Sequence, residues 1–191
     1  GELDLINFMD RVHLKAEIEG GAVFSLIGNH EIMNLLGDFR YSSTKDIQLQ
    51  GGIQKRQQLF SPGSDIFNKM SCTRNVILKI GDFVFVHAGI LPEHIHPSEK
   101  SQFITKLNTL MRLYLQGKKT WHDDDIQKYF LDKKGVIWNR NYGDETLSKK
   151  TCSSLDTVNK LLNVGHMVVG HTVQDNINSK CDNKLWRVDV G

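Results

Sequence analysis

The sequence lacks the features that mark several protein classes. It has no run approaching the roughly 18 apolar residues of a membrane-spanning helix, and no secretory signal pattern. Neither sign of charge dominates, because 24 Lys and Arg stand against 22 Asp and Glu, interspersed along the chain. We therefore expect neither a membrane span nor a nucleic-acid-binding surface.

Cysteine is scarce as well. Cys72, Cys152 and Cys181 are odd in number, far apart and in no C-x-x-C pair. Such a set is typical of reduced thiols, so a reducing compartment such as the cytoplasm is favoured. The chain has 191 residues, of which 39% are apolar, and this length and composition suit a single domain with a substantial core.

The spacing of apolar residues predicts an α/β chain. Apolar residues recur at helical intervals in four segments: 3–18, 98–115, 124–130 and 154–162. Short apolar runs of strand length cover residues 22–27, 76–80, 83–86, 167–169 and 185–190. Gly81 and Asp82 separate two of these runs and predict a hairpin turn. Residues 33–70 are rich in turn residues and predict short helices with irregular connections.

Three of the predicted strands end in side chains that can bind a metal ion or a phosphate. Asn29 and His30 follow the first, His87 follows the third and His171 follows the fourth, each beside glycine. Ligands and chemistry collect where strands end and loops begin. We therefore expect these four residues to cluster at one rim, although more than 140 residues separate the first from the last.

The blocks around these residues carry a family resemblance. Gly28-Asn29-His30-Glu31, His87-Ala88-Gly89 and Gly170-His171-Thr172 resemble the last three signature blocks of calcineurin-like metallophosphoesterases. The resemblance implies that Asn29, His87 and His171 bind the second of two metal ions and that His30 is the general acid. Glu31 is expected to anchor the block by hydrogen bonding rather than bind metal. One amide and two imidazoles suit Mn²⁺, Fe or Zn²⁺.

Two further segments narrow the resemblance. Residues 28–41, GNHEIMNLLGDFRY, are similar to a block of the Shewanella-like branch of the phosphoprotein phosphatases. Residues 136–140, VIWNR, resemble the branch's tryptophan-x-arginine block, which implies that Arg140 holds the substrate phosphate. Arg40 is a candidate phosphate contact or, equally, a surface arginine. The implied fold is a two-sheet α/β sandwich flanked by helices, and the implied reaction is hydroxide attack on phosphoserine, phosphothreonine or phosphotyrosine at two divalent metals.

The sequence departs from this family at its start. The family's first two blocks, GDxHG and GDxxDRG, supply carboxylates and a histidine to the metals, and neither block is present. We therefore expect an N-terminally incomplete domain that is itself inactive. Asn29, His87 and His171 are neutral, so a dication bound there would exchange its hydration shell for no anionic ligand. At most one weakly bound ion is expected on this chain.

Two alternatives stay open. A dinucleoside polyphosphate hydrolase shares the His-Ala-Gly-Ile and Gly-His-Thr segments, although residues 37–41 and 136–140 favour a protein phosphatase. A catalytically inactive domain retained for binding a partner is the second alternative. The sequence indicates no oligomeric state. Five histidines are expected to be non-catalytic: His13, His94, His96, His122 and His166.

Overall fold

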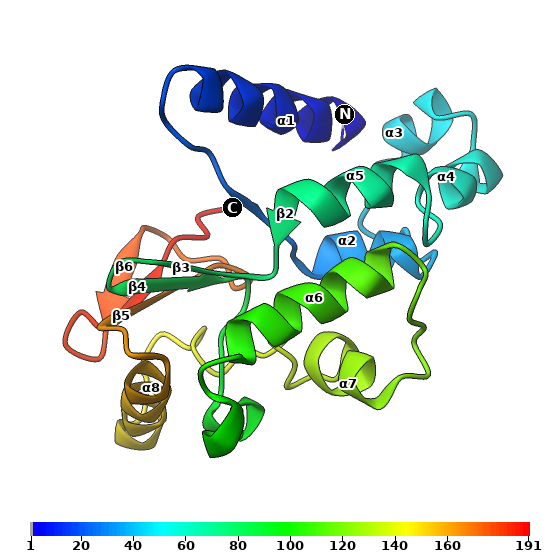
Figure 1. The fold of residues 1–191 in the computed structure, drawn as a ribbon. Coiled ribbons are helices and arrows are strands. Elements are labelled where there is room, and N and C mark those ends of the chain that lie inside the picture. Colours follow the sequence, from blue (N-terminus) through cyan, green and yellow to red (C-terminus); the bar gives the residue numbers. More distant parts are fainter. Residues whose placement is uncertain (1) are drawn as a thin grey trace.

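Two sheets organise residues 2–191, the part of the chain that the computed structural model describes (Figure 1). The smaller sheet pairs β1 (Ser25–Leu26) in parallel with β2 (Arg74–Asn75). The larger sheet has five strands in the order β3-β4-β5-β7-β6. The α/β class predicted from the apolar spacing is therefore confirmed.

The order of the larger sheet explains why distant parts of the chain meet. Its strands are β3 (Ile77–Ile80), β4 (Phe83–Val86), β5 (His166–Val169), β6 (Asn178–Lys180) and β7 (Leu185–Arg187). The β3–β4 and β6–β7 pairs are antiparallel, whereas β4, β5 and β7 run parallel to one another. The carboxyl ends of parallel neighbours lie at the same edge of a sheet. The residues that follow β4 and β5 are brought together in this way.

Helices and turns connect and cover the two sheets. The α-helices are α1 (Glu2–Ile18), α2 (Asn29–Leu35), α3 (Thr44–Leu49), α4 (Ile53–Leu59), α5 (Asp65–Thr73), α6 (Phe103–Leu115), α7 (Asp124–Ile126) and α8 (Lys149–Leu162). Short 3₁₀ turns cover Pro92–His94 and Pro97–Glu99, and a π-helical turn covers Gln127–Leu131. Ser148 caps α8 by accepting a hydrogen bond from the Thr151 N–H at 3.0 Å, so this helix begins before its apolar residues do.

The core forms where α6 lies across the molecule (Figure 1). The helix buries Phe103, Leu107, Leu110, Met111 and Tyr114, the five residues whose spacing predicted it. Deeply buried side chains of α5, β3 and the π-helical turn belong to the same hydrophobic cluster. The core therefore joins α5 and α6 to β3 of the larger sheet.

The prediction of three free thiols was wrong for two of the three cysteines. Cys152 and Cys181 form a disulfide, with Cα atoms 5.3 Å apart, whereas Cys72 is free. The bond links α8 to the turn between β6 and β7. The separation of 29 residues gives no sign of this contact, because only the packing of α8 beside the sheet brings the two residues together. The disulfide also removes the support that these two cysteines gave to a reducing compartment.

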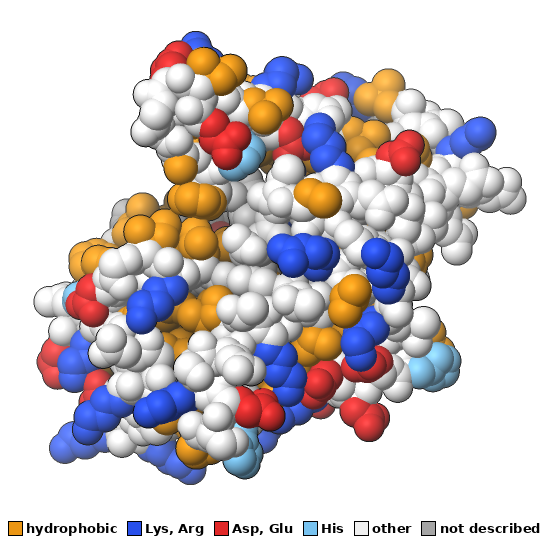
Figure 2. Space-filling model, viewed as in Figure 1, with side chains coloured by type: hydrophobic (Ala, Val, Ile, Leu, Met, Phe, Trp, Pro, Cys, Tyr) orange, Lys and Arg blue, Asp and Glu red, His pale blue; other side chains and the backbone are white. Residues whose placement is uncertain are grey.

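Helix α1 lies at the top of Figure 1, and its residues Glu2 and Asp10 form ion pairs with Arg56, Lys69 and Arg74. Leu5, Phe8, Leu14 and Ile18 on this helix are each more than half exposed. Figure 2 shows apolar side chains along α1 and over the body of the molecule below it. Among residues 2–191, no helix is both long enough and apolar enough to cross a membrane.

Candidate active site

A pocket of about 610 Å³ lies at the edge where β4 and β5 end. Its lining includes all four residues predicted to converge, Asn29, His30, His87 and His171, together with Arg140. These side chains come from three separate parts of the chain: the start of α2, the end of β4 and the turn after β5. The structure confirms that these four residues cluster at one rim.

Three of these side chains touch through their polar atoms. Nε2 of His87 lies 2.7 Å from Oδ1 of Asn29 and 3.1 Å from Nδ1 of His171. Gly28 makes this possible, because a Cβ atom there would lie 2.9 Å from the His87 ring. A glycine before Asn29 therefore lets the imidazole approach the backbone at the start of α2.

Hydrogen bonding fixes the tautomer of His171. Its Nε2 lies 3.0 Å from the carbonyl oxygen of Trp138, and a carbonyl can only accept. Nε2 therefore carries the proton, and Nδ1 presents its lone pair to His87. His171 also has φ of 65°, a left-handed conformation that is strained for a residue with a Cβ atom. This strained turn after β5 aims the ring into the pocket.

Burial keeps both imidazoles neutral. Burial, followed by the neighbouring His171 and His30, lowers the pKa of His87 to about 4. Burial is also the main cause of the lowered pKa of His171, followed by the charge of Arg140. Neutral imidazoles are the form that binds metal ions.

The donor set fits one divalent cation. Both contacts of His87 Nε2 go to acceptor atoms, Asn29 Oδ1 and His171 Nδ1, and one proton can satisfy only one of them at a time. A cation would satisfy all three atoms at once. Within residues 2–191, however, no group of three His, Cys, Asp or Glu side chains is arranged to hold a metal. The set therefore remains one amide and two imidazoles, without an anionic ligand.

His30 is held differently. Its exposed side chain stacks on the ring of Tyr41, with ring centroids 5.2 Å apart and an interplanar angle of 11°. Glu31, the next residue, accepts a hydrogen bond from the Gly28 N–H at 2.7 Å, and burial raises the pKa of its carboxyl. Glu31 thus fixes the first turn of α2, from which His30 projects.

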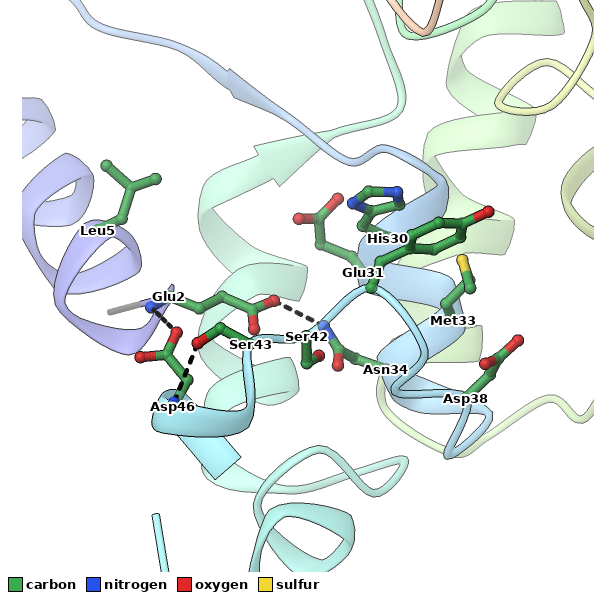
Figure 3. Close-up of a pocket in the computed structure, with 11 residues that line it drawn as sticks. Glu2, Leu5, His30, Glu31, Met33, Asn34, Asp38, Ser42, Ser43 and Asp46 are labelled. Carbon is green, nitrogen blue, oxygen red and sulfur yellow. Dashed lines mark hydrogen bonds between the residues drawn. The ribbon is translucent and has the colours of Figure 1, made fainter. Parts of the chain in front are cut away.

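A second pocket of about 410 Å³ shares His30, Glu31 and Tyr41 with the first (Figure 3). Glu2 of α1 reaches across it and accepts a hydrogen bond from Asn34 of α2 at 2.6 Å (Figure 3). The same carboxylate pairs with Arg56, which is fully buried and holds Asn34 Oδ1 at 2.7 Å. These contacts join α1, α2 and α4 beside the candidate acid.

The two predicted phosphate-binding arginines lie in different places. Arg140 lines the large pocket, and its Nη1 donates to the His171 carbonyl at 3.3 Å and to Thr172 Oγ1 at 3.2 Å. Arg40 lies outside the lining of that pocket and forms an ion pair with Asp38, with Nη2 and Oδ2 2.6 Å apart. The structure therefore places Arg140, and not Arg40, with the histidines.

Two pocket residues were missed by the sequence analysis. Tyr41 closes the predicted 28–41 block but was given no role there, and its contact with His30 is visible only in the structure. Asp189 follows β7, the parallel neighbour of β5, and also lines the pocket. The strand-end rule would have found it if the predicted last strand had not been extended to residue 190. Its carboxylate raises the pKa of His87 and His171, opposing burial.

Comparison with known proteins identifies the family. An uncharacterized protein of Acanthamoeba polyphaga mimivirus is 35% identical, over 96% of this chain and 86% of its own length. Shewanella-like protein phosphatase 2 of Arabidopsis thaliana is 27% identical over all of this chain. The crystal structure of a cold-active protein-tyrosine phosphatase of a psychrophilic Shewanella species superposes with a TM-score of 0.80 and 31% identity over 98% of this chain.

The chain belongs to the Shewanella-like protein phosphatase family. No general family profile matches it. It spans 58% of the Arabidopsis phosphatase and 55% of the Shewanella structure, so it corresponds to just over half of each. The resemblance seen in residues 28–41 and 136–140 is thereby confirmed at the level of the Shewanella-like branch.

Proposed function

We propose that the full product of the reading frame that contains this chain hydrolyses phosphate monoesters on proteins. The observation that carries the proposal is the meeting of Asn29 Oδ1, His87 Nε2 and His171 Nδ1 in one pocket with His30 and Arg140. A set of lone pairs that can hold a divalent cation, beside the Arg140 guanidinium and the His30 imidazole, suits an anionic phosphate ester better than a neutral substrate. Membership of a phosphatase family supports the same reading.

Asn29, His87 and His171 would hold one divalent metal ion, with Mn²⁺, Fe and Zn²⁺ all suited to this donor set. When two such ions are bound, as proposed for the complete enzyme, they supply an activated hydroxide and neutralise charge on the phosphoryl group. The Asp189 carboxylate, on the same pocket wall, favours a cation at the imidazoles.

The chain's own residues have separate tasks. The Arg140 guanidinium binds the oxygens of the substrate phosphate through its fork of N–H donors. His30 donates a proton to the leaving oxygen as the phosphorus–oxygen bond breaks, which matters most for the poorly leaving alkoxides of serine and threonine. Burial disfavours protonation of His87 and His171, so their lone pairs stay available to a metal ion.

Phosphotyrosine in proteins is the first substrate to test, because the solved relatives are named protein-tyrosine phosphatases. Phosphoserine and phosphothreonine peptides and a dinucleoside polyphosphate belong in the same panel. The dinucleoside polyphosphate separates the protein phosphatase from a nucleotide hydrolase with similar strand-end blocks. Binding of a phosphopeptide without turnover would indicate an inactive binding domain instead.

The test uses the full product of the reading frame that contains this chain, purified with Mn²⁺, Fe or Zn²⁺. We expect turnover of at least one phosphopeptide that stops on chelation and returns with metal. Arg140→Met should raise KM about tenfold or more, since a charge-assisted contact to phosphate contributes roughly 1.5–3 kcal/mol. Absence of turnover on every phosphomonoester with all three metals would overturn the proposal.

A further inference from the structure

A buried arginine outside the pocket lies close behind the turn that carries Arg140. Arg187, at the end of β7, is only 3% exposed. Its Nε donates to Asn178 Oδ1 at 2.8 Å, and its Nη1 donates to the carbonyl oxygens of Gly143 and Asp144 at 3.2 and 2.6 Å. Within residues 2–191, these hydrogen bonds go to amide and carbonyl oxygens rather than to a carboxylate.

Burying a guanidinium on neutral acceptors is costly, so the arrangement calls for an explanation. The molecule has a second buried arginine for comparison. Arg56 is fully buried too, but it pairs with the Glu2 carboxylate. Arg187 instead places its positive charge against two backbone carbonyls of one turn.

That turn leads directly to the candidate phosphate contact. The Gly143 N–H donates to the Arg140 carbonyl at 3.0 Å, which closes a tight turn over residues 140–143. Arg187 therefore fixes the exit of the turn whose entrance is Arg140. Gln174 strengthens the same point, because its Nε2 donates to the Gly143 carbonyl at 3.2 Å.

The turn also packs against the segment that follows β5. A Cβ atom on Gly143 would lie 2.5 Å from Thr172 Oγ1, so only glycine permits this approach. Thr172 Oγ1 in turn accepts from Arg140. Displacing the Gly143 carbonyl would therefore move Thr172 and Arg140 together.

We propose that Arg187 is a positioning residue that holds the 140–143 turn so that the Arg140 guanidinium faces the substrate phosphate. This inference rests on the proposed function, because it assigns Arg187 a role only through Arg140. Arg187 does not touch the phosphate itself. Its hydrogen bonds from the end of β7 fix the geometry of this turn.

Two variants and a control test the idea. Arg187→Met removes the donors, whereas Arg187→Lys keeps a cation that can still donate to the carbonyls. Leu107→Ala, in the buried face of α6, is a control that destabilises the core away from the turn. If Arg187→Met does not fold, the comparison is made with Arg187→Lys and Arg187→Gln.

The first measurement is amide hydrogen exchange, which requires no activity. We expect faster exchange over residues 140–144 in Arg187→Met, partial recovery in Arg187→Lys and no such local change in Leu107→Ala. Unchanged exchange in this turn for every Arg187 variant would overturn the proposal.

The second measurement is the KM of the full reading-frame product for p-nitrophenyl phosphate. We expect Arg187→Met to raise KM about 10-fold, with a smaller change in kcat, because misplacing a binding group mainly removes uniform binding. The double variant with Arg140→Met should be no worse than Arg140→Met alone. Additive losses would overturn the proposal.

The two proposals fail separately. If Arg140→Met leaves KM unchanged while the exchange result holds, the phosphate-binding role of Arg140 fails and the structural clamp stands without its function. If Arg140→Met raises KM but Arg187→Met does not, the positioning role fails and the proposed function stands.

Discussion

The two sides of the candidate pocket are built by different means. On one side, His87 Nε2 lies 2.7 Å from Asn29 Oδ1 and 3.1 Å from His171 Nδ1, and the Trp138 carbonyl fixes the tautomer of His171. On the other side, His30 is exposed and is held by one aromatic stack on Tyr41. The side proposed to bind metal is preformed at the strand ends, whereas the candidate acid is only loosely restrained within residues 2–191.

This difference indicates how the two tasks are divided. Metal ligands must converge within a few tenths of an ångström, and backbone geometry at the ends of parallel strands provides that accuracy. A general acid needs an orienting partner as well as a place, since its reach to the leaving oxygen is a single hydrogen bond. We therefore expect changes on the two sides to have distinct signatures.

The largest effect concerns the chain of 191 residues by itself. We expect it to bind no more than one Mn²⁺ weakly and to show no phosphatase turnover, because its preformed ligands are one amide and two neutral imidazoles. Calorimetric titration with Mn²⁺ and an assay with p-nitrophenyl phosphate would measure both quantities. Tight uptake of two ions per chain would break the comparison, since anionic ligands would then have to come from the loosely held side.

The next effect lies on the acid side. His30→Ala in the full reading-frame product should lower turnover by about 10²–10⁴-fold, the usual contribution of a general acid. The loss should be greater for phenyl phosphate than for p-nitrophenyl phosphate, whose leaving group needs little protonation. His122→Ala, an exposed histidine outside the pocket, is the control. Equal losses on both substrates would show that His30 is not the acid.

His94 is a reference for a histidine that burial and hydrogen bonds at both ring nitrogens keep neutral. His94 is buried, with Nδ1 accepting from the Leu91 N–H at 3.0 Å and Nε2 donating to the Lys134 carbonyl at 2.9 Å. Burial lowers its pKa from 6.5 to about 4. The unfolded chain therefore takes up a proton as pH falls below about 6.5 while the native chain does not. The free energy of unfolding should fall by about 3 kcal/mol between pH 7 and pH 4.

Urea denaturation at a series of pH values would measure this term as a difference between the wild-type protein and His94→Asn. The asparagine can still accept from the Leu91 N–H, but it does not titrate. We expect a shallower pH dependence in the variant, with the two curves separating below pH 6.5. Parallel curves would mean that His94 is not kept neutral by burial.

The smallest expected effect concerns the stack of Tyr41 on His30. Tyr41→Leu removes the stack on His30 and keeps an apolar side chain. An aromatic pair contributes about 0.5–1.5 kcal/mol, so turnover should fall between about 2-fold and 10-fold. If the stack orients His30, the loss should also depend on the leaving group, in the same sense as for His30→Ala. A loss of the size seen for His30→Ala would show that Tyr41 is a principal support of the acid.

Much of this architecture could be predicted from local patterns. The helical spacing within residues 98–115 predicted a helix, which formed over Phe103–Leu115. The two apolar runs joined by Gly81-Asp82 formed the predicted hairpin. The meeting of His87 and His171 could be predicted because they lie just after β4 and β5, parallel neighbours whose ends lie at one edge. Asn29 follows β1 of the smaller sheet, so the strand-end rule alone does not explain why it joins them.

The remaining features depend on packing that no local pattern records. Residues 178–180 form an edge strand although all three are polar, because pairing with β7 is enough to hold them. Residues 127–131 form a π-helical turn where helical spacing alone predicted an α-helix. The role of Arg187 was equally hidden, since a single arginine in a short strand carries no sign of the carbonyls that it reaches.

The disulfide between Cys152 and Cys181 has a topological consequence for the pocket. In the unfolded chain it makes residues 152–181 a closed ring, and that ring contains β5 and the His171 turn. Closing a loop of this length removes chain entropy equivalent to roughly 3–4 kcal/mol from the unfolded state. The ring limits the conformations that the unfolded chain can adopt around His171. We therefore expect the segment that carries His171 to be the last part of the ligand set to separate from its neighbours on unfolding.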